Sequence, residues 1–405
     1  MISKREIIDV ATIKGLNPHI VEKDYVLGWL LWGISNHEIL GESWLFKGGT
    51  CLKKCFFETY RFSEDLDFTL SDATHIDDGF LKTVFGEICE HIYQQTGIEL
   101  PSHSHKFDIY QNPRGGKSCQ ARIGYQGPVS PRGRSMPRIK FDLTADEFVV
   151  LSPVRSQVYH PYSDAPNGDI IIRSYAYEEA FGEKIRALAE RGRPRDLYDV
   201  VNLFRNADAR PASTAVLIDV LRQKCEFKKI DFPVLAQLEI HRSILQNRWA
   251  QMLSHQLPFL PPFVTFWNEL PIFFTWLESG ITPQIPPAYT GEAGERVIRE
   301  RTLLLQVSAK VKACIEIIRF AASNLLCVDL DYRGNIRRIE PYSLRFNGEG
   351  GIILGVHDVD KNERDGYLVD NIQGVQITDQ VFNPRFAIEL MPATQITGVP
   401  AGNSS

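Results

Sequence analysis

The sequence predicts an α+β protein in which a mixed domain with a helical layer precedes a small β domain. Three observations support this fold class. Short apolar strands surround two glycines and a pair of aspartates in the first part of the chain. Amphipathic helices dominate the middle, and a stretch rich in Pro and Gly separates them from a series of short strands. The 405 residues are enough for two or three domains.

In the first part of the chain, helices and strands are predicted to alternate. Apolar residues recur at helical spacing over residues 3–14, 20–34 and 78–96, whereas residues 44–46 and 65–70 read as strands. After residue 100 the pattern changes to strands and then to helices. Strands are predicted at 107–110, 119–126 and 137–143, and helices at 176–191, from Pro194 onward, and at 213–225, 233–255 and 263–278.

The end of the chain is predicted to form a separate unit. Residues 281–295 read as a linker, and residues 391–405 as a flexible tail of small and polar residues. Between them, residues 296–390 are predicted to fold as a small, curved β domain preceded by one helix. The helix is expected at about 295–324, and the strands at 326–332, 336–345, 351–357, 365–369 and 373–378.

Composition limits the classes of protein that the chain can represent. The formal net charge of −5 gives no global argument for nucleic-acid binding, so any basic surface must be local. Seven cysteines without a Cys-x-x-Cys pair favour a reduced, cytoplasmic setting. The polar N-terminal sequence is unlike a signal peptide, and no apolar run approaches the ~20 residues that span a bilayer. We therefore expect a cytoplasmic protein without a membrane partner.

The residues that carry chemistry begin with an acid pair. Asp65 and Asp67 stand two apart on a predicted strand, so their carboxylates share one face. Paired carboxylates repel each other unless a cation lies between them. Mg²⁺ takes such oxygen ligands, usually one or two carboxylates together with substrate phosphates. Lys140 and Asp142 share a face of strand 137–143, so Asp142 becomes a third carboxylate if that strand lies beside 65–70.

A glycine turn precedes the acid pair. Gly48 and Gly49 have no Cβ and let the backbone approach a ligand closely. Thr50 is predicted to begin a helix whose free N–H groups favour an anion. A phosphate-binding turn one short helix away from a metal-binding acid pair indicates a nucleotidyl-transfer site.

Two further segments have both a functional and a structural interpretation. Helix 176–191 places Lys184 and Arg191 on one face, and Asp196 follows Pro194, where an acid near a helix N-terminus is favourable without any catalytic role. Residues 114–140 hold seven basic side chains and no acid, which indicates a nucleic-acid or triphosphate surface or, equally, a solvated face. They are Arg114, Lys117, Arg122, Arg132, Arg134, Arg138 and Lys140. A P-loop is excluded here because Gln111 occupies the position of its first glycine.

These motifs occur in an order that resembles the AbiEii/AbiGii toxin family of nucleotidyltransferases, within the polymerase-β-like superfamily. The segments that carry the resemblance are 21–25, 46–50 with 61–67, 139–143, 183–188 with Arg191, and 194–199. The resemblance implies a polymerase-β-like nucleotidyltransferase domain over 1–280, with a catalytic core at about 20–200 and a helical part at about 200–280.

The resemblance also implies roles for single residues. Two Mg²⁺ (or Mn²⁺) ions are expected on Asp65, Asp67 and Asp142, and Lys184 and Asp196 would complete the catalytic set. The residues expected to meet the triphosphate are Gly48, Gly49, Thr50, Lys53, Ser63 and Lys184.

Residues 296–390 resemble the WYL-domain group, whose members are SH3-like barrels that often sense nucleic acid or nucleotide ligands. The matching segments are 337–345, 351–355 and 364–370. Candidate ligand contacts are Tyr332, Arg338, Tyr342, Arg345 and Arg364, and barrel packing with solvated arginines is the alternative.

Together these features predict a metal-dependent enzyme that transfers a nucleotide from a nucleoside triphosphate to a hydroxyl group. The acceptor is expected to be the 3′ end of an RNA such as tRNA, ahead of an untemplated oligonucleotide or a side chain of the protein itself; a DNA acceptor is a further expectation. The chain would act as a toxin or in antiphage defence, with a cognate antitoxin or effector encoded nearby. The rival functions are a nucleic-acid-binding regulator and a nucleotide-sensing partner that neutralises a neighbouring effector.

Overall fold

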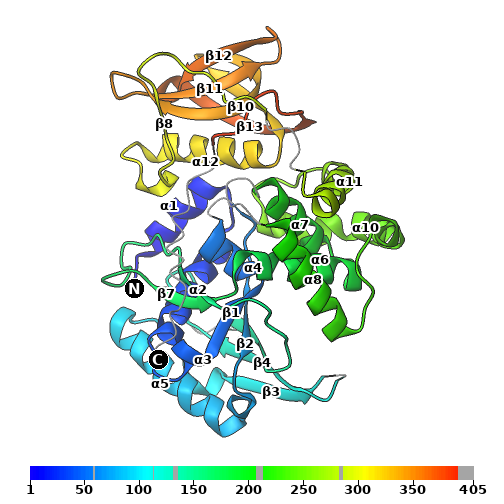
Figure 1. Cartoon of the computed structure of the whole chain (residues 1–405). Coiled ribbons are helices and arrows are strands. Elements are labelled where there is room, and N and C mark those ends of the chain that lie inside the picture. The colour runs from blue at the N-terminus through cyan, green and yellow to red at the C-terminus, as the bar shows by residue number, and fades with distance from the viewer. Residues whose placement is uncertain (58–59, 113, 131–135, 207–212, 282–285, 391–405) are drawn as a thin grey trace.

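The computed structural model describes residues 1–57, 60–112, 114–130, 136–206, 213–281 and 286–390. It contains two β-sheets, one in each part of the chain, with a helical layer beside the first sheet (Figure 1). The predicted mixed α+β class is confirmed. The predicted tail 391–405, part of the linker, and Arg132 and Arg134 lie outside the described residues.

The first sheet is mixed, with the order β3-β4-β5-β2-β1-β7-β6. β2 pairs with β5 and β1 pairs with β7 in parallel, and the other neighbours are antiparallel. The short strands β6 and β7 were not predicted from the sequence. The strands are β1 Trp44–Lys47, β2 Asp65–Leu70, β3 Lys106–Gln111, β4 Lys117–Gly124, β5 Arg138–Thr144, β6 Val154–Gln157 and β7 Ile171–Ser174.

One face of this sheet is apolar and covered by helices. Along β5 the side chains alternate between exposed and buried, so Ile139 and Phe141 point into the core. Helix α5, Asp78–Thr96, covers this face: the ring of Phe85 packs against those of Phe107 and Phe141. Helix α2 packs beside α5. Besides α5, the α-helices of this region are α1 Lys4–Lys14, α2 Pro18–Ser35, α3 Leu40–Ser43 and α4 Gly48–Cys51.

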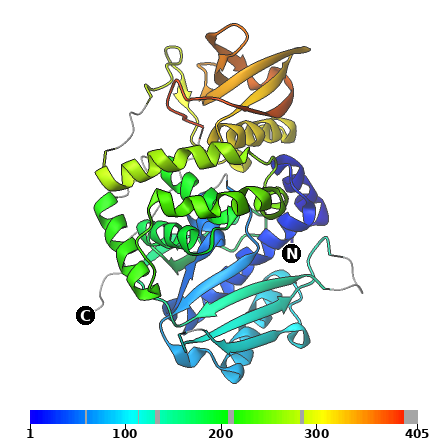
Figure 2. The same ribbon diagram turned by 90° about the vertical axis from the view of Figure 1, so that its right-hand side faces the viewer.

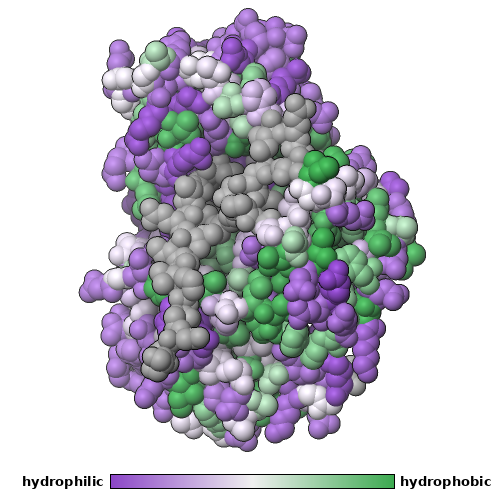
Figure 3. All heavy atoms as spheres, viewed as in Figure 1, coloured by the Kyte–Doolittle hydropathy of each residue, from purple (hydrophilic) through white to green (hydrophobic). Residues whose placement is uncertain are grey.

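The helical layer has an aromatic core. The ring of Phe266 contacts those of Tyr198 and Trp249, and the rings of Phe181, Phe273 and Trp276 form a second group. Apolar residues also reach the surface over this layer (Figure 3). The predicted helix 233–255 is wrong in its middle, because a 3₁₀ turn at Glu239–His241 divides it. The helices are α6 Tyr177–Arg191, α7 Pro194–Arg205, α8 Thr214–Lys228, α9 Leu235–Leu238, α10 Arg242–Leu253 and α11 Phe263–Ser279.

The second sheet is antiparallel, with the order β12-β11-β10-β9-β13 and β8 paired to β10. Helix α12, Ala309–Ser323, packs on it through Ile315 and Ile318. A C-terminal antiparallel sheet was predicted, and its SH3-like or WYL identity stays a prediction. The strands are β8 Arg296–Val297, β9 Leu326–Tyr332, β10 Asn335–Phe346, β11 Ile352–Asp358, β12 Glu363–Leu368 and β13 Ile372–Val381.

The predicted helix 295–324 is wrong before Ala309. Ser308 caps α12, since its hydroxyl accepts a hydrogen bond from the amide of Val311 at 3.3 Å. Arg319 holds the preceding segment against α12 by donating to the Thr302 hydroxyl at 2.8 Å and to the Glu300 carbonyl at 2.9 Å. These tertiary hydrogen bonds replace the helical ones that the sequence pattern predicted.

The two parts of the chain meet where α12 lies against α1 (Figure 1). The ammonium of Lys14 lies 3.2 Å from the carboxylate of Glu316, and both side chains are 7% exposed. All seven cysteines are buried and free. In the described ranges no helix is both long and apolar enough to cross a bilayer.

Candidate active site

The three predicted carboxylates lie together on the open face of the first sheet. β2 and β5 are parallel neighbours, and their register places Asp67 opposite Asp142 and Asp65 opposite Lys140. Residues opposite each other on neighbouring strands point to the same face. The condition that the sequence set for Asp142 is therefore met, because its strand lies beside 65–70.

The glycine turn packs directly against this acid group. Gly48 directly follows β1 and has a φ of 79°, and a Cβ built on it would lie 2.0 Å from an oxygen of Asp67. A Cβ on Gly49 would lie 2.5 Å from Nη2 of Arg61 and 3.1 Å from Oγ of Ser63. The helix begins at Gly48, two residues earlier than predicted. Thr50 lies in its first turn and donates its hydroxyl to the carbonyl of Asp65.

Crowding makes the charged form of Asp67 unfavourable. Burial is the largest cause, followed by the negative charge of Asp142, and together they raise the pKa of Asp67 to about 7, although Lys47 and Lys184 pull it down. Partial desolvation and the charge of Asp65 also raise the pKa of Asp142. A cation bound beside these carboxylates would reduce their mutual repulsion.

Cations from α6 lie over the acid group. The ammonium of Lys184 is 2.7 Å from Oδ2 of Asp199 and 3.7 Å from Oδ1 of Asp196. Arg191 donates two hydrogen bonds to Asp196, at 2.8 and 2.9 Å. Both Lys184 and Arg191 interact electrostatically with Asp67. The acids of α7 therefore hold the cations of α6 close to the acids of β2.

Asp199 joins Lys184 to the glycine turn. It is fully buried, and its two oxygens accept hydrogen bonds from Nε and Nη2 of Arg61, both at 2.7 Å, and one from the Tyr60 hydroxyl at 2.6 Å. Burial would raise the pKa of Asp199, but Arg61 and Lys184 outweigh it and lower the pKa. The same Nη2 of Arg61 lies under Gly49, so Asp199 fixes both a cation of the site and the backbone of the turn.

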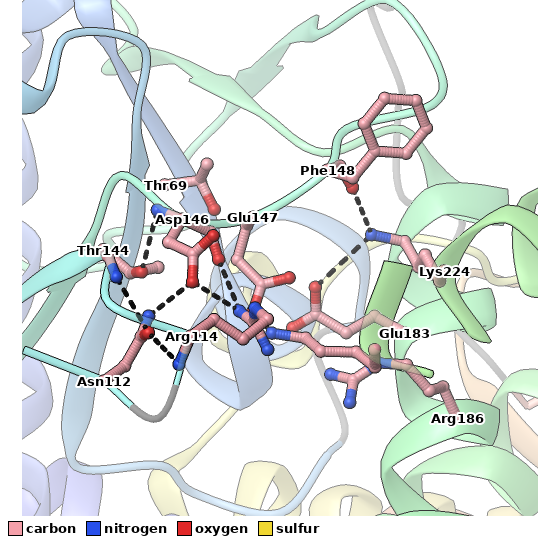
Figure 4. A network of polar contacts seen from close by, with 12 residues as sticks. Thr69, Asn112, Arg114, Thr144, Asp146, Glu147, Phe148, Glu183, Arg186 and Lys224 are labelled. Atoms are coloured by element: carbon pink, nitrogen blue, oxygen red, sulfur yellow. Dashed lines mark hydrogen bonds and ion pairs between the residues drawn. The ribbon is translucent and has the colours of Figure 1, made fainter. Parts of the chain in front are cut away.

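A second ion network borders the site (Figure 4). The carboxylate of Glu183 lies 3.6 Å from the ammonium of Lys224 and 3.8 Å from that of Lys47. Burial alone would lower the pKa of Lys47, but the charge of Glu183 reverses this and raises it. Arg114, from the basic run, pairs with Asp146 at 2.7 Å in this network, which ties that arginine to the protein itself.

Lys53 is buried beside aromatic rings. Its ammonium is 4.9 Å from the centre of the Phe62 ring and 5.9 Å from that of Tyr159. It also helps to lower the pKa values of Asp24 and Glu316. Contact of Lys53 with a triphosphate stays a prediction.

Among the five ligand candidates of the C-terminal sheet, Tyr342, Arg345 and Arg364 lie around the rings of Tyr289 and Phe386. Arg338 pairs with Asp329 through two hydrogen bonds, and the buried Tyr342 donates its hydroxyl to Glu340 at 2.7 Å. The guanidinium of Arg345 lies 2.6 Å from Glu389. Tyr332 packs beside Tyr367, and the exposed Arg364 lies over the ring of Phe386. Tyr342 and Arg345 thus have the contacts of packing residues, and ligand sensing by the five stays a prediction.

Sequence reasoning assigned no role in the site to four residues: Lys47, Arg61, Arg191 and Asp199. Part of the signal was available. Asp196 and Asp199 stand three apart on one helix, and Lys184 and Arg191 seven apart on another, so each pair shares a face. Once both helices are predicted, the sequence therefore shows one helix with two acids on a face and another with two cations on a face. Such a pair of helices could have been expected to pair through these residues.

Comparison with known proteins gives one family. The family model described as nucleotidyl transferase AbiEii toxin, type IV TA system, matches residues 29–278. Among solved structures, MenT4, a nucleotidyltransferase toxin from Mycobacterium tuberculosis H37Rv, is 18% identical, with a TM-score of 0.43 over 69% of this chain and 90% of that chain. No curated protein matches the chain.

Proposed function

The chain belongs to the AbiEii family of type IV toxin–antitoxin systems and is a nucleotidyltransferase, and we propose that it transfers a nucleoside monophosphate from a nucleoside triphosphate to a hydroxyl group of an RNA. Membership of this family implies a nucleotide substrate and a cognate antitoxin. The observation that carries the proposal is the close packing of the Gly48 turn against the Asp67 carboxylate, because it brings the turn proposed to bind phosphate next to the acid group.

Mg²⁺ or Mn²⁺ is the metal proposed for Asp65, Asp67 and Asp142. The donor set supports this, since all three donors are carboxylate oxygens and burial and mutual repulsion raise the pKa of two of them. Within the described residues, no three His, Cys, Asp or Glu side chains lie close enough to hold an ion as they stand. In proteins Mg²⁺ usually takes one or two carboxylates together with substrate phosphates. Two bound ions would stabilise the attacking and leaving oxygens of an in-line displacement.

The protein's own residues then act by position and charge. The absence of a Cβ at Gly48 and Gly49 lets Asp67 and Arg61 pack directly against the backbone of the turn. Lys184 and Arg191 supply positive charge beside Asp67. Asp196 and Asp199 keep these cations in fixed positions. Charge fixed in advance is the main contribution that proteins make to phosphoryl transfer. The acceptor oxygen forms a bond to the α-phosphorus, and the bond to the bridging oxygen breaks as pyrophosphate leaves.

The remaining proposals concern the setting of this activity. The C-terminal sheet is proposed to be an SH3-like, WYL-like module that senses a nucleic-acid or nucleotide ligand, and residues 1–280 to be the catalytic unit. The enzyme is proposed to work in the cytoplasm as a toxin or in antiphage defence. Support comes from the family membership and from the second, separate hydrophobic core of the C-terminal sheet.

The test uses purified protein, Mg²⁺ and each ribonucleoside triphosphate labelled at the α-phosphate, with and without total RNA. RNA labelled at its 3′ end is expected, with no labelling by Asp67→Asn. Sequencing of the labelled RNA and mass spectrometry of the protein identify the acceptor. Label found only on the polypeptide, or in free oligomers made without RNA, would replace RNA as the acceptor. Equal labelling by wild type and Asp67→Asn would contradict the site.

A further inference from the structure

A row of basic side chains crosses the open face of the first sheet and ends at the acid group. Lys106 on β3 is opposite Arg122 on β4, Arg122 is opposite Lys140 on β5, and Lys140 is opposite Asp65 on β2. We call Lys106, Arg122 and Lys140 the cationic row. Since neighbouring strands are about 4.8 Å apart, the row extends roughly 14 Å from Asp65.

The cationic row lies on the accessible side of the sheet. α5 covers the opposite side, whereas Lys106 and Lys140 are exposed and Arg122 is half-buried. Figure 2 shows these strands below the helical layer. Arg122 has an acidic neighbour, because its guanidinium lies 3.2 Å from Asp108. This pair is solvent-exposed and is therefore weak enough to exchange with another anion.

The next row on the same face is different in charge. Asp108, Gln120, Asp142 and Asp67 are opposite one another in that order across the same four strands. The face therefore carries two rows. The row from Asp108 to Asp67 is suited to a metal at its β2–β5 end, and the cationic row is suited to a negatively charged ligand along its length. Tyr110, two positions beyond Asp108, is 47% exposed and offers an aromatic surface on this face.

We propose that the cationic row binds the sugar–phosphate backbone of a single-stranded polynucleotide acceptor and leads its terminal hydroxyl to Asp65 and Asp142. This inference rests on the proposed function. Positive charges that recur at strand spacing suit the repeated phosphates of a polymer. The proposed positive partners of the triphosphate are other residues, Lys184 and Arg191, which interact electrostatically with Asp67. Tyr110 supplies a surface on which a base can stack.

The described basic residues of 114–140 do not all lie in this row. Arg114 is paired with Asp146. Arg138, two positions before Lys140 on β5, is exposed on the same face and extends the row's positive charge. Lys106 belongs to the row although it lies before the basic run in sequence.

The test measures binding without any transfer reaction. The probe is a single-stranded RNA of about 12 nucleotides with a 5′ fluorophore, followed by anisotropy in EDTA and without nucleoside triphosphate. The variant is Lys106→Gln with Arg122→Gln. The matched control is Lys82→Gln with Arg222→Gln, which makes the same change in charge at exposed positions on α5 and α8.

The expected loss follows from counterion release. Each phosphate contact with a single strand contributes about 0.7 to the slope of log K against log salt, so the variant should lose about 1.4 in slope. At 0.1 M salt this corresponds to roughly 25-fold weaker binding. The control should bind within about twofold of wild type. A single-stranded DNA of the same sequence should show the same loss, since the backbone is the ligand.

The outcomes separate this inference from the proposed function. Equal affinity and equal salt slope in the variant and the control would overturn the cationic row as the binding surface, even if transfer to RNA occurs. Failure of wild type to bind the probe at 50 mM salt would also overturn it. So would competition by polyglutamate as strong as that by unlabelled RNA. Loss of binding in the variant alone supports the row, and it does so whether or not nucleotide transfer is detected.

Discussion

Replacing Asp199 with Asn tests how the site is held together. Asn keeps the shape of the side chain but removes the charge that faces Arg61 and Lys184. Asp199 and Arg61 are 0% and 2% exposed, and Lys184 is 11% exposed, so the two cations would stay buried without a carboxylate between them. Breaking a buried ion pair from one side costs roughly 3–5 kcal/mol of folding free energy.

This cost predicts a measurable change in melting temperature. At about 2–4 °C per kcal/mol for a domain of 150–250 residues, Tm should fall by roughly 6–20 °C at pH 7.5. Circular dichroism measures this change. Arg61 and Lys184 lower the pKa of Asp199 against the effect of burial. Its carboxylate therefore stabilises the fold above the ordinary aspartate pKa of about 4, and this contribution is lost as pH falls further. The difference in Tm between wild type and Asp199→Asn should therefore become smaller below that pH.

An exposed acid provides the control for this variant. Asp9 is 59% exposed and lies 3.8 Å from Arg5, so Asp9→Asn should change Tm by no more than about 2 °C. Asp199→Asn should also lose nucleotide transfer, because Lys184 and the backbone at Gly49 lose their common support. An Asp199→Asn protein with the Tm and the activity of wild type would refute this account of the site.

Three other substitutions test the parts of the site separately. Asp67→Asn should abolish transfer while Tm holds or rises, because burial and Asp142 raise the pKa of this carboxyl to about 7; a large fall in Tm would contradict this. Lys184→Ala should raise the KM for the nucleoside triphosphate more than Lys184→Arg, and steady-state kinetics with equal values for Ala and wild type would remove its proposed role. Gly48→Ala should abolish transfer, because its Cβ would meet Asp67 at 2.0 Å. Gly115→Ala is its control: it has a similar φ of 84° with open space around it, so only the backbone cost of about 1–2 kcal/mol should appear in thermal unfolding and activity should remain.

The parts of the fold that could be predicted depend on local patterns. Helix α5 was predicted at 78–96 and is observed at Asp78–Thr96, because its apolar spacing is regular and Asp77 caps its N-terminus. The shared face of Asp65 and Asp67 follows from the two-residue period of a strand. Asp142 could be proposed as a third carboxylate because apolar and polar residues alternate clearly in its own strand. Only the structure shows that this strand pairs with the strand of Asp65 and Asp67.

The parts that could not be predicted depend on contacts between distant residues. Arg61 and Asp199 are 138 positions apart, and nothing local to either shows that they form a buried pair. The sequence favoured Asp196 as the acid of this helix, whereas the structure places Asp199 at the centre of the hydrogen-bond network. Likewise, residues 295–308 read as helix, but Arg319 fixes Thr302 in a different conformation.

The central claim is nucleotidyl transfer, and the fate of each phosphate tests it most directly. Wild-type protein would be incubated with RNA and with the preferred nucleoside triphosphate labelled either at the α- or at the γ-phosphate. We predict that the α label becomes covalently attached to RNA and that the γ label is released as pyrophosphate in equal amount, with neither product formed by Asp65→Asn or Asp67→Asn. Transfer of the γ label to an acceptor, or release of γ label as inorganic phosphate without attachment of the α label, would contradict it.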